Sequence, residues 1–333
     1  MDTTTLRAPA ACPSGGSVRI AVQRLLQNRV SALFVLLVLY NLVFAIVKPA
    51  SFLTVDNYLS ILVNMSIESF IVIGMTVLLV AGNLDLSLGA NMALAGILCG
   101  MLIKFSHLGV AFAFGASLLA SLGMGMVNGY VIAFVGVNPV ITTLATAFVY
   151  QGIAVWLAGP GFTDFPDYFK MYGQSKFLGV QGPIWYALVA TVVFHLLMSN
   201  ARSFRRFYFV GASKRAATMS GINTPRTVFA AFVIAAVLAN LAGVVTASRF
   251  NSSMTSIGTG VELRAITAAV IGGVSFTGGT GTVLGAILGA LFLAFVNNGL
   301  ILLGVEPSWQ NVVVGVILVF SIVIDVASAA KRR

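Results

Sequence analysis

The chain has 333 residues, of which 59% are hydrophobic and only 8% carry a charge. A soluble domain carries about a quarter charged residues, so this chain could not cover a water-facing surface with polar groups. The composition therefore excludes a disordered protein, a nucleic-acid binder and an ordinary soluble enzyme. It predicts an all-α, polytopic integral membrane protein that contacts membrane lipid.

The net charge of +10 comes from lysines and arginines that gather in three places. Four arginines precede the first apolar run, six basic residues lie between Arg202 and Arg226, and three basic residues end the sequence. Short segments rich in Lys and Arg stay in the cytoplasm. We therefore predict a disordered cytoplasmic N-terminal tail over residues 1–27, one transmembrane domain over 28–328 with a cytoplasmic loop at 201–225, and a basic cytoplasmic C-terminus over 329–333.

A helix needs about 20 apolar residues to cross the bilayer core. About ten segments approach this length, and they cover residues 31–47, 60–81, 86–103, 108–135, 139–158, 183–199, 226–247, 263–274, 280–303 and 309–326. An even number of spans returns both ends to the same side, in agreement with the charges. The loop at 159–182 is then expected on the outer side.

Two glycine-rich stretches, 80–98 and 270–288, resemble each other at a constant offset of 190 residues. A duplicated half is a recurrent transporter design, although two glycine-rich turns could also resemble each other by chance. We predict an internal duplication. The residues expected to shape the two turns are Asp85, Ser87, Gly89, Gly272, Gly273, Gly278 and Gly279.

Glu68, within a predicted span, and Asp85, at the start of another, are the carboxylates considered as candidates for ion coupling. Asp85 stands just before Leu86, where it can cap a helix and meet the positive end of its dipole. We favour this capping role over proton transfer.

Polar side chains at helical spacing mark candidate pathway residues. Ser60, Asn64 and Glu68 share one helix face, and lipid would penalise such a stripe unless it faced protein or water. Hydroxyls, amides and an aromatic edge suit a neutral polyol better than a charged solute, and interhelical hydrogen bonding is the alternative reading. The candidates are Asn64, Glu68, Thr142, Thr146, Tyr150, Asn297 and Asn298.

No nucleophile–base pair, metal-ligand cluster or phosphate-binding G-x-x-x-x-G-K-[S/T] loop occurs in the sequence. We therefore expect no catalytic residue, no metal and no cofactor bound by this chain. Gly281, Gly285 and Gly289 are spaced one turn apart, which predicts close helix packing within the bilayer.

The basic loop contains a short run of helix formers, 212–220, bounded by Gly211 and Gly221. This pattern predicts a helix of one to two turns along the cytoplasmic face. The same pattern is also compatible with a simple topology anchor.

The sequence G-N-L-D-L-S-L-G at 82–89, A-A-x-x-S-G-I at 216–222 and the run 272–305 closely resemble the permease subunits of ribose/xylose/galactose-type ABC importers. These belong to the branched-chain-amino-acid/sugar permease superfamily. The resemblance implies a pore-forming subunit in the bacterial inner membrane that works as a homodimer or half of a heterodimer. It also implies a cytoplasmic ATPase that binds ATP, and a sugar-binding protein outside.

The resemblance further implies that the basic loop holds a helix that couples the permease to the ATPase. The coupling residues would be Gly211, Ser213, Ala216, Ala217, Ser220 and Gly221. Family members commonly carry acidic residues where this chain has Lys214 and Arg215, which makes a dedicated ATPase partner plausible. The functional prediction is a membrane subunit that passes a monosaccharide or related polyol, and the alternative is an ion-coupled secondary transporter.

Overall fold

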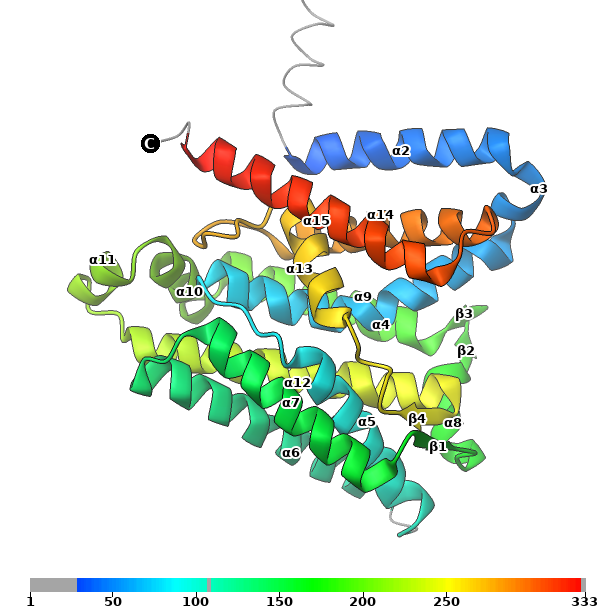
Figure 1. Cartoon of the computed structure of the whole chain (residues 1–333), viewed down its shortest axis with the longest axis horizontal. Helices are drawn as coiled ribbons and strands as arrows, with labels where there is room; N and C mark the ends of the chain where they lie inside the picture. The colour runs from blue at the N-terminus through cyan, green and yellow to red at the C-terminus, as the bar shows by residue number, and fades with distance from the viewer. Residues whose placement is uncertain (1–28, 107–108, 331–333) are drawn as a thin grey trace, which may run out of the picture.

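The computed structural model describes residues 29–106 and 109–330 (Figure 1). The predicted 1–27 tail and the last three residues of the predicted C-terminal segment lie outside the described residues. The elements in chain order are α2 (Arg29–Val47), α3 (Pro49–Phe52), α4 (Val55–Val80), α5 (Leu88–Lys104), α6 (Val110–Tyr130), the π-helix η1 (Val131–Val135), α7 (Pro139–Ala158), β1 (Gly161–Thr163), α8 (Asp167–Gln174), β2 (Lys176–Phe177), β3 (Val180–Gln181), α9 (Gly182–Asn200), α10 (Arg202–Ala212), α11 (Lys214–Met219), α12 (Thr224–Phe250), β4 (Ser252–Met254), α13 (Val261–Ile271), α14 (Val283–Leu302) and α15 (Pro307–Ala330).

Every predicted apolar segment coincides with a helix, which confirms the all-α membrane fold. Within residues 29–106 and 109–330, seven helices are both long and apolar enough to cross a membrane. Helix α5 has 17 residues and α13 has 11, so at 1.5 Å per residue they extend only about 26 Å and about 17 Å. Because the bilayer core is about 30 Å thick, α13 covers roughly half of it. A count of ten complete spans is therefore not confirmed.

Several helices begin at a side chain that caps the first turn. Thr54, Asn138, Asn223 and Thr282 each accept a hydrogen bond from a backbone N–H two or three residues onward, at 2.9–3.2 Å. A cap of this kind satisfies one of the donors that a helix N-terminus leaves free. These four residues set the starts of α4, α7, α12 and α14.

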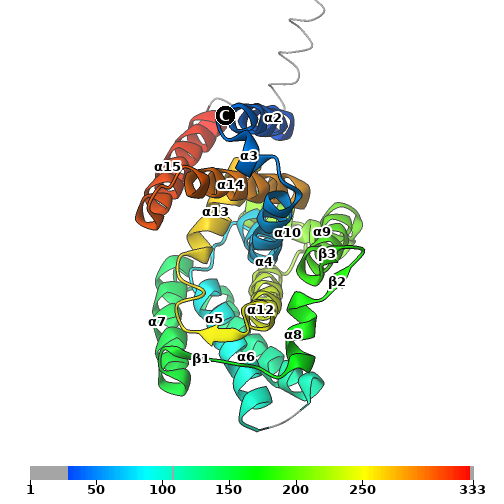
Figure 2. The same ribbon diagram turned by 90° about the vertical axis from the view of Figure 1, so that its right-hand side faces the viewer.

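Helices α4 and α12 form the centre of the bundle (Figure 2). Their most apolar windows are 78% and 67% buried, whereas that of α2 is only 17% buried. Helix α12 packs against α4, α5 and α6, and α4 also packs against α9, α13 and α14. The outer helices therefore leave most of their apolar surface to the lipid, while α4 and α12 hold the core.

The two ends of the bundle carry different elements. Helices α10 and α11, the beginning of α2 and the end of α15 lie toward one end, and α8 and the four strands lie at the other (Figure 1). Strands β1 and β4 pair antiparallel, as do β2 and β3. The basic loop at 201–225 and the loop at 159–182 are thus on opposite ends, as predicted.

Two glycine-rich loops interrupt the bundle, between α4 and α5 and between α13 and α14. Gly82, Gly278 and Gly279 have φ values of 71°, 92° and 78°, in the region that side chains rarely adopt. Both loops join two helices, as the repeat predicts. The helices before them differ, at 26 residues for α4 and 11 for α13, and the duplication stays a prediction.

Candidate functional site

A row of polar and charged side chains runs along one face of α4. Arg264 of α13 donates to Glu68 at 2.9 Å, and the side chains of this pair are 25% and 33% exposed. Arg249, at the end of α12, donates to the amide oxygen of Asn64 at 2.9 Å. Side chains from α12 and α13 thus contact the polar stripe that the sequence predicted on α4, and Arg264 compensates the charge of the Glu68 carboxylate.

The end of α14 closes this row. Asn298 and Asn57 exchange amide hydrogen bonds of 2.7 and 3.3 Å. The side-chain oxygen of Asn297 is buried and accepts no hydrogen bond from the described part of the chain. A cavity of about 90 Å³ lies here, lined by Ile61, Asn64, Met65, Glu68, Ala294, Asn297, Asn298 and Ile301. Four of the predicted pathway residues therefore surround one polar cavity.

A larger cavity of about 380 Å³ lies on the other side of α13, between α5, α7 and the chain that precedes α13. Its lining includes Glu262, Gln151 and the exposed ring of Phe148. The Nε2 of Gln151 donates to the backbone oxygen of Thr255 at 3.0 Å. Carboxylate, amide and aromatic face are groups that can contact a neutral polyhydroxylated solute.

The predicted α7 residues lie beside this cavity, and its lining is on a neighbouring face of the helix, rotated around the axis from them. The cavity is lined by Leu144, Ala147, Phe148 and Gln151, whereas the predicted residues were Thr142, Thr146 and Tyr150. Tyr150 is buried, and its hydroxyl donates to the carbonyl of Met124 on α6 at 3.1 Å. Thr142 donates to the carbonyl of Asn138, the N-cap of α7, and Thr146 donates to the carbonyl of Thr143.

Asp85 organises the first glycine-rich loop. One carboxylate oxygen accepts from the backbone N–H of Ser87 at 2.7 Å and from its hydroxyl at 2.6 Å. The amide of Asn128 donates to the Ser87 hydroxyl at 2.8 Å, which ties the loop to α6. Asp85 therefore stabilises the turn that precedes α5, whose N-cap position is Ser87, and a direct cap of the helix by Asp85 stays a prediction.

Gly89 lies in the first turn of α5, where the backbone that leads into α13 crosses close to this helix. A Cβ at this position would lie 2.2 Å from the carbonyl oxygen of Gly258 and 2.3 Å from the Glu262 carboxylate. Glycine is thus required where α5 passes the chain that leads into α13. The first motif therefore lies against the lining of the larger cavity.

Asp325 of α15 holds the second glycine-rich loop. Its carboxylate accepts from the hydroxyl of Ser275 at 3.1 Å and from the backbone N–H of Phe276 at 3.0 Å. Behind this loop Gly272 and Gly285 meet backbone to backbone, because a Cβ on either would lie within 2.2 Å of the other's carbonyl oxygen. The predicted close packing at Gly285 is therefore present.

The two loops meet the end of α10 at one junction. The N–H of Gly279 donates to the carbonyl of Val80, at the end of α4, at 2.9 Å. A Cβ on Gly211 would lie 1.8 Å from the same carbonyl oxygen and 2.7 Å from the Gly279 nitrogen. A Cβ on Gly278 would lie 2.9 Å from both Gly211 and Gly82. Three segments far apart in sequence thus touch through backbone alone.

The predicted short helix is present as α11, immediately beyond this junction. The Ser213 side chain caps it by accepting from the N–H of Ala216 at 3.2 Å. Ala217 is 3% exposed and anchors the helix. The remaining predicted coupling residues, Ser213, Ala216, Ser220 and Gly221, are exposed. Helix α11 is exposed and capped, and the end of α10 joins it to both internal loops. A partner that binds α11 could therefore displace those loops.

The family model described as "Branched-chain amino acid transport system / permease component" matches residues 57–322 of the chain. This match covers the polar row, both glycine-rich loops and the α10–α11 segment. The chain belongs to this permease family. It is a multi-pass membrane transporter component and not an enzyme.

Curated relatives resemble the permease over most of its length. The ribose import permease protein RbsC of Escherichia coli (strain K12) is 32% identical over 299 residues, covering 88% of this chain and 92% of the relative. RbsC of Haemophilus influenzae (strain ATCC 51907 / DSM 11121 / KW20 / Rd) is 31% identical over 304 residues, covering 90% and 94%. The autoinducer 2 import system permease protein LsrC of Salmonella typhimurium (strain LT2) is 30% identical over 303 residues, covering 91% and 87%. None of the solved structures gives a significant match.

The cations that compensate the polar row of the permease were not predicted from the sequence. Arg249 and Arg264 lie at or near the ends of predicted spans, whereas the charged residues predicted as membrane candidates were the carboxylates Glu68 and Asp85. The signal that could have found them is a basic residue at the edge of one apolar segment when another apolar segment contains a carboxylate that needs a counter-ion. Asp325 was missed because it is a single polar residue in the last apolar segment, with no helical companion.

Proposed function

We propose that this permease is the translocating subunit of an ATP-driven importer for a monosaccharide or related polyol. The observation that carries the proposal is the junction at Gly82, Gly211 and Gly279, which fastens an exposed helix to both internal loops. An ATP-driven importer needs such a connection between a peripheral motor and the transport path. The names of the relatives, which import ribose and autoinducer 2, favour a sugar-like solute.

The cytoplasmic ATPase would dock on α11 and bind the ATP itself. The surface at this end is cationic, because Arg202, Arg205, Arg206, Lys214, Arg215 and Arg226 are all exposed. Lys and Arg in short loops favour the cytoplasmic side, which supports cytoplasmic N- and C-termini in a bacterial inner membrane. The groove of the ATPase that receives α11 would be acidic.

A solute-binding protein would dock at the opposite end, on the chain around α8 and the strands. The path itself would run past the two cavities, which are lined by residues of α5, α7 and α13 and by residues of α4 and α14. A second permease copy or a paired permease would complete it. The bound sugar would meet Glu262, Gln151 and Phe148 on the way.

In this mechanism ATPase closure would displace α11 and α10. The junction would pass that displacement to the end of α4 and to the loop before α14, since backbone contacts cannot relax by changing rotamers. The path would then switch between outward and inward access. A nucleotide shifts this equilibrium only as far as it binds the two states with different affinity.

The Glu68–Arg264 pair argues against an ion-coupled transporter. Glu68 lies 2.9 Å from Arg264, so an ion-coupled cycle that used this carboxylate would have to break the ion pair in every turnover. The pair instead neutralises charge beside the polar cavity.

Uptake by proteoliposomes tests the proposal. The permease is reconstituted with its ATPase and binding protein, and uptake of labelled ribose and other monosaccharides is followed with and without ATP on the ATPase side. We expect uptake only with ATP and the binding protein. Uptake driven by a proton or sodium gradient without ATP, and abolished in Glu68→Gln, would establish the ion-coupled alternative.

Labelling of intact cells tests the orientation. A cysteine introduced at Lys214 should be protected from a membrane-impermeant maleimide, and one at Lys176 on the β2–β3 hairpin should react. Both positions are exposed, so accessibility differences report the side of the membrane. Reaction at position 214 from the exterior would overturn the assigned sides and the ATPase contact with them.

A further inference from the structure

A second cavity system in the permease lies away from the polar row. A crevice of about 840 Å³ separates α9 from α6 and α12, with α4 as its floor. Its walls are apolar side chains such as Phe70, Phe114, Val193 and Leu241. Helix α9 itself packs against α4, α8, α10 and α14, so the crevice lies where two parts of the bundle diverge.

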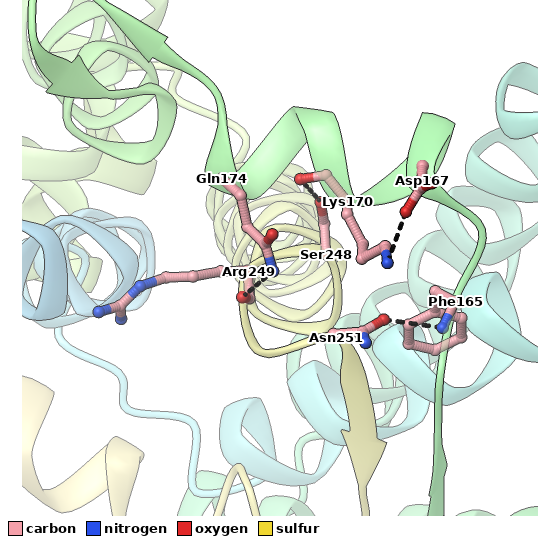
Figure 3. A network of polar contacts seen from close by, with 7 residues as sticks. All are labelled: Phe165, Asp167, Lys170, Gln174, Ser248, Arg249 and Asn251. Carbon is pink, nitrogen blue, oxygen red and sulfur yellow. Dashed lines mark hydrogen bonds and ion pairs between the residues drawn. The ribbon is translucent and has the colours of Figure 1, made fainter.

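Helix α8, at the end of the bundle opposite α11, closes one end of the crevice with Phe169 and Tyr172. It is attached to the end of α12 by polar contacts (Figure 3). The Ser248 hydroxyl donates to the carbonyl of Phe169 at 2.6 Å, and the Gln174 amide donates to the carbonyl of Arg249 at 2.9 Å. Gly173 lies so close to α12 that a Cβ would be 2.4 Å from the Arg249 nitrogen. Helix α8 is thus fixed to the end of α12, and the crevice is preformed.

The lining excludes water and polar solutes. A buried water needs two to four polar partners, and the walls are almost wholly hydrocarbon and aromatic. A sugar in the crevice would leave its hydroxyls without hydrogen-bond partners, and each unpaired hydroxyl would add to the free-energy cost of binding. The crevice therefore takes an apolar occupant.

The aromatic residues show which way that occupant lies. Tyr172, Trp185 and Tyr186 carry polar tips, and all three belong to α8 or the first turns of α9, at the end that α8 closes. The Trp185 indole N–H donates to the carbonyl of Phe177 at 3.3 Å, next to the exposed cation of Lys176. Toward the other end the lining on α9 is Val189, Ala190, Val193 and Phe194. Tyr and Trp favour the headgroup layer, whereas aliphatic walls suit acyl chains.

We propose that an acyl chain of a bilayer phospholipid occupies this crevice, with its headgroup beside α8 and the β2–β3 hairpin. The lipid fills the gap between α9 and α12 that protein side chains leave. It also supports α8, and through α8 the end of α12, where the Arg249 side chain reaches across to Asn64. The site is separate from the polar cavities and does not depend on the transported solute.

Photo-crosslinking tests the proposal. The permease is reconstituted in phosphatidylethanolamine and phosphatidylglycerol vesicles that contain phosphatidylethanolamine with a diazirine at mid-chain, and labelled peptides are mapped after irradiation. We expect labelling concentrated on the walls of the crevice, on α6, α9 and α12. Labelling spread evenly over all lipid-facing helices, α2 included, would overturn the proposal.

Two adjacent valines of α9 provide a matched pair. Val193 lines the crevice and is 44% exposed, while Val192 is 48% exposed and is outside that lining. Val193→Trp should fill the space and reduce crevice labelling at least fivefold, and Val192→Trp should leave it within twofold. Equal labelling in both variants would refute the site.

The alternative occupant is a second copy of the permease, and it has its own readout. Val193→Cys should form no disulfide-linked dimer on oxidation, because a lipid chain covers it. An efficient crosslink between two copies at this position would show that the crevice is a protein interface and overturn the proposal. Because wild-type labelling is measured first, a variant that fails to fold leaves the mapping result standing.

Discussion

Gly211→Ala perturbs the junction with the smallest side chain available. The added Cβ would lie 1.8 Å from the Val80 carbonyl oxygen, where ordinary van der Waals contact begins at 3.4 Å. The backbones must therefore separate by about 1.6 Å, which is the difference between these two distances. Overpacking of this kind costs about 1–3 kcal/mol, and losing the Gly279–Val80 hydrogen bond adds about 1 kcal/mol.

Two assays follow from this displacement. Thermal unfolding in detergent should show a Tm several degrees lower than that of the wild type, because the expected loss is about 2–4 kcal/mol. In proteoliposomes, sugar uptake should fall further than ATP hydrolysis, since the junction transmits movement without touching nucleotide.

Gly123→Ala on α6 is the matched control. No atom lies within 4 Å of a Cβ built at this position, so the substitution meets open space. It should be neutral or stabilise α6 by up to about 1 kcal/mol, the difference in helix propensity between Gly and Ala. If Gly211→Ala matched Gly123→Ala in both Tm and uptake, the inferred contact at the junction would be wrong.

Three further substitutions test separate parts of the permease. Ser220→Trp, at the exposed end of α11, should leave membrane insertion and Tm unchanged while sugar uptake falls and ATP hydrolysis continues; unchanged uptake would remove α11 from the coupling role. Gly285→Leu places a Cβ 2.2 Å from the Gly272 carbonyl oxygen and should destabilise the α13–α14 contact by more than about 3 kcal/mol, seen as reduced yield of folded protein; a normal yield and Tm would contradict it. Asp325→Ala leaves the Phe276 N–H without its acceptor and should lower stability by about 1–3 kcal/mol, while Asp325→Asn, which keeps an acceptor, should lower it less.

The positions of the helices could be predicted because they depend on local sequence. Apolar runs of about 20 residues have few alternatives in a bilayer, where every backbone group must be paired within the segment. The short α11 could also be predicted, since Gly211 and Gly221 bound its helix formers. A complete span at 263–274 is not confirmed, because hydropathy does not show that α13 ends at Ile271, before the loop.

The partners of the site residues could not be predicted in the same way. Glu68 and Arg264 are 196 residues apart, and the sequence of either segment contains no information about the other. On α7 the spacing identified a polar stripe, but packing decided its direction, because the Tyr150 hydroxyl found the Met124 carbonyl inside the bundle. The spacing of polar residues identifies which side chains share a helix face, whereas tertiary packing decides which groups that face contacts.

The junction and the Glu68–Arg264 pair are connected by rigid elements at both ends. Glu68 lies 12 residues before Val80 on α4, a distance of about 18 Å along a continuous helix. Arg264 belongs to α13, whose following loop carries Gly279 to the same junction. We therefore expect a displacement of α10 that separates Val80 from Gly279 to pivot α4 against α13, and the ion pair at the polar cavity is the contact that would resist or follow this pivot. Coupling of the two sites requires only that these two elements move as units, and the backbone-to-backbone packing at Gly211, Gly272 and Gly285 leaves them little freedom to do otherwise.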